Sequence, residues 1–141
     1  MGFGCAEAHR KASAPVARKL YFAVELHRQG KLVGHPKLLG ETGKVLKAER
    51  RQPGSDVADY VLMLTPTQSG AGLYHLDLDV AVPEAVGHSE ISLLHGEVRK
   101  LELGHKPGDL AVTLTLMEVD SPEFRTLMQL MRESRGRPGA I

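Results

Sequence analysis

The stretch that decides the fold is LAVTLTLMEV, residues 110–119 of a chain of 141 residues. Within it, leucine or valine occupies every second position: Leu110, Val112, Leu114 and Leu116. Successive side chains of a β-strand point to opposite faces of the sheet, so this period of two gives the strand one apolar face. The stretch therefore predicts a strand that packs one face against a core.

The same alternation recurs upstream of this strand. Residues 20–27 and 73–82 alternate apolar and polar side chains, and 60–65 (YVLMLT) is a continuous apolar run typical of a central strand. Shorter segments at 31–39, 44–51, around Ile91 and around Leu101 complete the series, and Pro36 predicts that segment 31–39 is an edge or bulged strand. About eight strands at roughly ten-residue spacing predict a mostly β fold, an antiparallel β-sandwich or barrel.

One amphipathic helix is expected after the last strand, at about residues 122–134. Ser121 is a favoured N-cap and Pro122 suits the first helical position. The helix gathers four apolar side chains on one face: Phe124, Leu127, Met128 and Met131. Two interpretations stay open: this face covers one end of the sandwich core, or it binds a partner, either another protein or a second copy in a homodimer.

An approximate internal repeat relates residues 34–65 to residues 87–115. Each segment begins with Gly-His, continues through a Leu-Leu pair, and reaches a Pro-Gly turn before an apolar strand. A unit of three short strands cannot bury a face alone, so we expect the two units to pack as facing sheets.

Length and composition favour one domain. A chain of this size fits a single domain, which we place at residues 19–134. Residues 1–18 are expected to be disordered and resemble a vector-derived segment, and residues 135–141 are expected to form a disordered tail. Cys5 is the single cysteine, so no internal disulfide forms.

Charge and hydropathy exclude some partners. Eighteen basic and 17 acidic side chains give a net charge of +1, without the concentrated positive field of a nucleic-acid binder. No window approaches the ~18 apolar residues of a transmembrane helix. We expect a cytoplasmic protein, or a periplasmic or extracellular one if a leader has been removed.

Catalytic and metal-binding signals are weak. No nucleophile elbow or complete phosphate-binding loop occurs, so neither an enzyme nor a bound cofactor is expected. Among seven histidines, the candidate metal ligands are His75, Asp77 and His88, but the favoured interpretation is that His75, Asp77 and Asp79 form the solvent side of an amphipathic strand.

These observations favour a non-enzymatic β-sandwich that mediates protein–protein interaction or self-assembly, in a bacterial cell envelope. The alternative is a small-ligand or metal-binding module that uses surface histidines.

Overall fold

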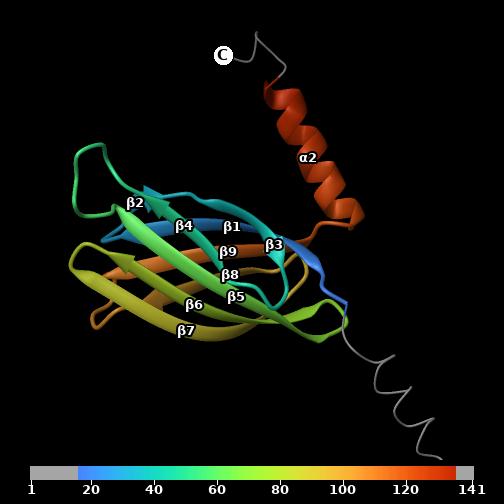
Figure 1. The fold of residues 1–141 in the computed structure, drawn as a ribbon, viewed down its shortest axis with the longest axis horizontal. Helices are drawn as coiled ribbons and strands as arrows, with labels where there is room; N and C mark the ends of the chain where they lie inside the picture. The colour runs from blue at the N-terminus through green and yellow to red at the C-terminus, as the bar shows by residue number, and fades with distance from the viewer. Residues whose placement is uncertain (1–15, 136–141) are drawn as a thin grey trace, which may run out of the picture.

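Two antiparallel β-sheets face each other in the computed structural model, which describes residues 16–135 (Figure 1). Sheet A contains β1 (Lys19–Arg28), β2 (Lys31–Gly34), β3 (Lys37–Glu41), β8 (Val98–Leu103) and β9 (Leu110–Glu118). Sheet B contains β4 (Leu46–Arg50), β5 (Tyr60–Gly70), β6 (Leu73–Val82) and β7 (Ala85–Leu94). Helix α2 (Pro122–Arg135) follows β9. The predicted mostly β, antiparallel sandwich with a C-terminal helix is confirmed.

The strand order joins the two ends of the fold. Sheet B runs in sequence order, β4-β5-β6-β7, whereas sheet A has the order β2-β1-β9-β8 with β3 also paired to β1. The first and last strands are therefore neighbours in the centre of sheet A. Their pairing extends over eight residue pairs, from Leu20 opposite Glu118 to His27 opposite Ala111.

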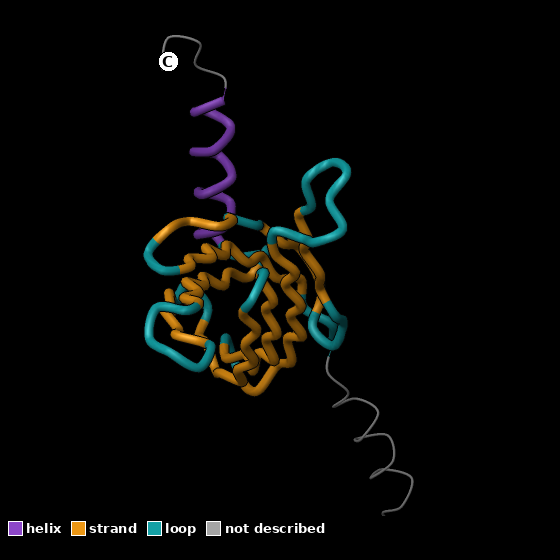
Figure 2. Tube along the Cα trace, turned by 90° about the vertical axis from the view of Figure 1, so that its left-hand side faces the viewer, coloured by secondary structure: helices purple, strands orange, loops and turns teal. Residues whose placement is uncertain are grey.

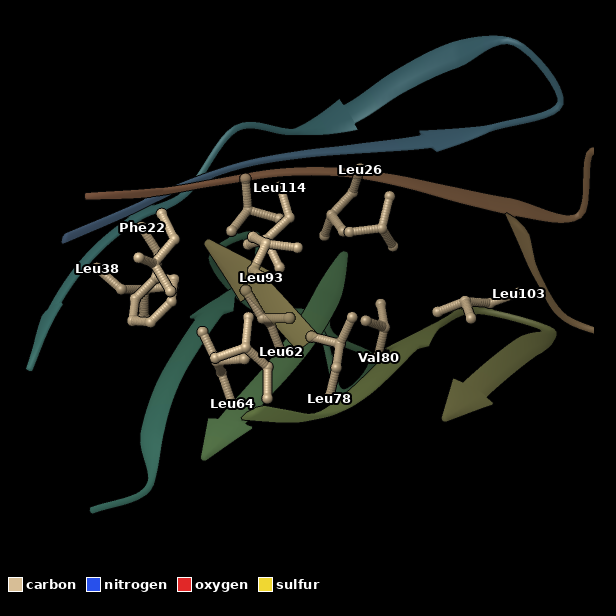
Figure 3. Packing of buried hydrophobic residues seen from close by; sticks show 14 of the residues in the cluster. Phe22, Leu26, Leu38, Leu62, Leu64, Leu78, Val80, Leu93, Leu103 and Leu114 are labelled. Carbon is tan, nitrogen blue, oxygen red and sulfur yellow. The ribbon is translucent and has the colours of Figure 1, made fainter. Parts of the chain in front are cut away.

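The core follows directly from the alternation and the register. In sheet A, Phe22 lies opposite Leu116 and Val24 opposite Leu114, and all four side chains are 0% exposed. Figure 3 shows the leucines and valines of the two sheets pointing toward one another across the sandwich. The strand faces that the alternation predicts to be apolar thus pack together in one shared core. Burial of this apolar surface away from water favours folding.

The two sheets approach each other closely where their edges meet. A Cβ atom on Gly40 of β3 would lie 1.9 Å from Cδ2 of Leu46 in β4, and one on Gly87 of β7 would lie 2.5 Å from Cβ of Leu103 in β8. Only glycine leaves room for these side chains. Figure 2 shows the strands curving around a common interior, with α2 leaving at one end.

The segment predicted as a single strand at 31–39 is two strands. β2 and β3 are separated at His35 and Pro36, and they pair with opposite halves of β1. Pro36 has no N–H to donate to a ladder, but its carbonyl oxygen accepts a hydrogen bond from the Val24 N–H at 3.0 Å. The proline therefore divides the segment into two strands that both stay paired with β1, and residues 16–135 contain nine strands.

The expectation that each repeat unit forms one of the two facing sheets is wrong. Segment 34–65 contributes β3 to sheet A and β4 with the first half of β5 to sheet B, while segment 87–115 contributes β8 and most of β9 to sheet A and most of β7 to sheet B. Each segment is divided between the two sheets, because β3 pairs with β1 of sheet A and β7 pairs with β6 of sheet B.

The predicted disordered segments fall mostly outside the described residues, as does Cys5. Residues 16–18 are described and lead into β1, where the Arg18 N–H donates a hydrogen bond to Thr42 Oγ1 at 3.0 Å. Within residues 16–135, no helix is both long enough and apolar enough to cross a lipid bilayer.

Truncating a core side chain tests this packing. Leu78→Ala removes a fully buried side chain, so we expect the free energy of unfolding to fall by about 2–5 kcal/mol. Leu32→Ala makes the same chemical change at a side chain that is 58% exposed and should change stability by less than about 0.5 kcal/mol. Urea unfolding followed by circular dichroism measures both, and equal losses would contradict the assigned core.

Candidate functional site

Helix α2 begins where the sequence predicts, at a capped N-terminus. Ser121 Oγ accepts a hydrogen bond from the Phe124 N–H at 3.1 Å and donates one to the Glu118 carbonyl oxygen at 2.6 Å. The first satisfies an N–H that has no partner inside the helix, and the second holds the cap against the end of β9. The start of the helix is therefore fixed to sheet A.

Beyond its first turn, α2 leaves the sandwich. Phe124 is buried, and the centre of its ring lies 5.3 Å from that of Tyr21 on the outer face of sheet A. Leu127, Met128 and Met131 stay partly exposed, and Figure 1 shows the helix pointing away from both sheets. The helix thus does not cover an end of the core, and three of its four predicted contact residues are only partly buried within the described chain.

A polar network fixes the base of α2. The Tyr74 hydroxyl donates to Glu118 Oε2 at 2.5 Å, and the Arg18 guanidinium lies 3.4 Å from the same oxygen. His95 Nδ1 accepts the Glu118 N–H at 2.9 Å, so the proton of the neutral ring is on Nε2, which donates to Glu123 Oε1 at 2.6 Å. Burial, reinforced by Glu118, raises the pKa of Tyr74 above its usual range.

This network was not predicted from the sequence. Tyr74 and Glu118 are 44 residues apart, and only the packing of sheet B against sheet A brings them together. No local spacing rule covers such a contact. The one available signal was a tyrosine in an otherwise leucine-rich strand face, because a buried tyrosine hydroxyl needs a polar partner.

A second group of polar side chains lies on the outer face of sheet B. The alternation of β6 turns Leu76 and Leu78 into the core and leaves His75, Asp77 and Asp79 outside. The β6–β7 register then places His88 opposite Asp79 and Glu90 opposite Asp77.

Three of these residues come together as what we call the Asp–His cluster: Asp77, Asp79 and His88. His88 Nδ1 lies 2.8 Å from Asp79 Oδ1 and 3.5 Å from Asp77 Oδ1. Within residues 16–135, this is the one group of three or more histidine, cysteine or acidic side chains whose donor atoms all lie within 4.8 Å of one another.

The structure brings together two of the three predicted metal ligands, Asp77 and His88. The third, His75, lies on the same face but pairs with Glu90, with its Nε2 atom 3.1 Å from Glu90 Oε1. Asp79 takes its place in the cluster. The sequence placed Asp79 on this face, but only the cross-strand register shows that it is the direct neighbour of His88.

The cluster shifts the protonation of its histidine. The hydrogen bond with Asp79 raises the pKa of His88 above its ordinary value, and the carboxylates of Asp77 and Glu90 act in the same direction. Asp77 Oδ1 has no solvent contact and no hydrogen-bond partner, although the rest of its side chain is partly exposed. A carboxylate oxygen without a hydrogen-bond partner is unusual where solvent does not reach it, and the nearest donor is His88 Nδ1 at 3.5 Å.

An apolar groove adjoins the cluster on sheet B. It has a volume of about 450 Å³, and apolar residues from β5, β6 and β7 line it: Val61, Met63, Val80, Ala81 and Val86. Asp79, His88 and His105, which lies in the β8–β9 turn, supply its polar lining. The groove thus offers apolar contact beside a carboxylate and two imidazoles.

The raised pKa of His88 depends chiefly on Asp79, so we expect Asp79→Asn to lower that pKa. Folding raises the pKa of His88, so the pair with Asp79 stabilises the protein fully at pH values below the pKa of an unfolded histidine. This stabilisation is lost as the pH rises through the pKa of His88 in the folded state. An NMR titration of the histidine ring protons measures the change. Asp56→Asn, in the exposed β4–β5 loop, is the control, and an unchanged pKa in Asp79→Asn would contradict the assigned pair.

None of the protein-family models, curated proteins and solved structures compared with this chain matches it. The candidate functional sites are therefore two surfaces of the molecule: the projecting helix α2 with the adjoining face of sheet A, and the Asp–His cluster with its groove on sheet B.

Proposed function

We propose that this protein is a non-enzymatic interaction module that self-associates, with α2 of one copy docking on the outer face of sheet A of a second copy. The observation that carries the proposal is the state of α2: one apolar side chain, Phe124, is buried, while Leu127, Met128 and Met131 continue the same helical face and are only partly buried.

The length of α2 supports a docking role. The helix has 14 residues and so extends for about 21 Å. Helices of this length are marginal in water unless an apolar face packs against something, because nucleation is costly and propensity adds little. Phe124 is the one buried apolar side chain of α2 among the described residues, so a partner that completes the burial of Leu127, Met128 and Met131 stabilises the rest of the helix.

The outer face of sheet A offers a matching surface, which makes a second copy the partner we favour. Leu39, Tyr21 and Met117 form a row across β3, β1 and β9. Tyr21 is already covered by Phe124 of the same chain and is buried, so the part of the row that is open to a second helix lies at Leu39. Leu39 is 66% exposed beside Tyr21, and two copies related by a twofold axis cover both helices and both rows at once.

Charge on the apolar face of α2 tests the proposal. The double variant Leu127→Glu with Met131→Glu is expected to convert a dimer into a monomer, because carboxylates are costly to bury in an apolar interface. Light scattering coupled to size-exclusion chromatography measures the molar mass of the 141-residue chain and of its variants. Concentrations of about 10–100 μM are suitable, because they populate a dimer whose dissociation constant is about micromolar.

Gln129→Glu is the control, because it adds a single carboxylate on the opposite, exposed side of α2 and should remain dimeric, and Leu127→Glu alone adds the same single charge on the apolar face. Leu39→Glu tests the acceptor row and should weaken the dimer at least about tenfold, which corresponds to about 1.4 kcal/mol. A wild-type chain that stays monomeric over the whole range would contradict self-association, and a dimer unaffected by Leu39→Glu would contradict docking on sheet A.

A further inference from the structure

We propose that the Asp–His cluster on sheet B is a binding site for a divalent transition-metal ion of the zinc type. Asp77 and Asp79 supply carboxylate oxygens and His88 supplies an imidazole nitrogen. The site lies on a different sheet from the α2 docking surface and does not depend on self-association.

The backbone fixes the three donors in advance. β6 is an inner strand of sheet B, hydrogen-bonded to β5 on one side and to β7 on the other. Asp77 and Asp79 are two residues apart on its outer face, and His88 is the direct cross-strand neighbour of Asp79. An ion that binds here does not have to order a loop, so little conformational entropy is lost.

The distances between the donors suit one shared ion. In a tetrahedral site with metal–ligand bonds of about 2.0–2.1 Å, neighbouring donor atoms are about 3.3 Å apart. The observed separations of 2.8 Å to Asp79 and 3.5 Å to Asp77 from His88 Nδ1 lie on either side of that value. An ion can therefore replace the proton between His88 and Asp79 after small side-chain rotations.

The donor set indicates the class of ion. Imidazole nitrogen together with carboxylate oxygen suits Zn²⁺ and similar transition metals, whereas Ca²⁺ and Mg²⁺ are bound almost entirely by oxygen. Three protein donors leave further coordination positions for water or another ligand, and Asp79 and His88 also line the apolar groove.

A separate observation points to a cation at this place. Asp77 Oδ1 itself has no solvent contact and no hydrogen-bond partner among the described residues, although the Asp77 side chain as a whole is 48% exposed. His88 Nδ1, at 3.5 Å, is too distant for a good hydrogen bond and is already bonded to Asp79 Oδ1. A metal ion between the three side chains supplies the missing interaction, because it coordinates this oxygen directly.

Isothermal titration calorimetry of the whole chain with Zn²⁺ alone measures the affinity and the number of bound ions, and thereby tests the site. We expect micromolar binding at one site that perturbs the amide signals of β6 and β7 in NMR spectra. His88→Ala and Asp79→Asn should each weaken this binding at least tenfold. Asp79→Asn nearly preserves side-chain volume, so it keeps the test valid if His88→Ala fails to fold.

His75→Ala is the matched control. His75 lies on the same face of β6 but outside the cluster, so its loss should leave Zn²⁺ affinity within about twofold of wild type. Binding no tighter than millimolar would overturn the proposal. So would tight binding that survives both cluster variants, or binding that perturbs signals only outside β6 and β7.

Discussion

The pairing of β1 with β9 is the interaction on which the rest of the structure depends. It joins the two ends of the domain in the centre of sheet A, and its register directs Phe22, Val24, Leu114 and Leu116 to the same side. A shift of one residue would turn these side chains out to solvent. The pairing also sets where β9 ends, and thereby where Ser121 caps α2 and where Glu118 meets Tyr74.

Sequence reasoning succeeded where the signal is local and failed where it is not. The alternation of residues 73–82 predicted the bounds of β6, and the capping residues predicted the start of α2. Nothing local indicates which sheet β3 joins, because that depends on its pairing with β1. The candidate site shows the same limit: period two placed Asp77 and Asp79 on one face, but the β6–β7 register decided that His88 joins them while His75 pairs with Glu90.

The two candidate surfaces lie on the outer faces of different sheets. Both inner faces are occupied by the apolar core, so any binding chemistry has to lie on the outer faces, at α2 or in loops. Sheet A carries the contact between Tyr21 and Phe124, from which α2 extends. Sheet B carries the Asp–His cluster and its groove. Because the core separates these faces, the proposed docking surface and the proposed metal site do not overlap.

The central claim is that the two sheets form the complete core while α2 beyond Phe124 lies outside it. Hydrogen exchange of the full chain, at a concentration low enough to keep it monomeric, tests this most directly. Amides of β1, β5, β6 and β9 should exchange only through global unfolding, whereas those of α2 after its first turn should exchange far faster, through local opening. Protection of α2 equal to that of β9 in the dilute monomer would contradict the account.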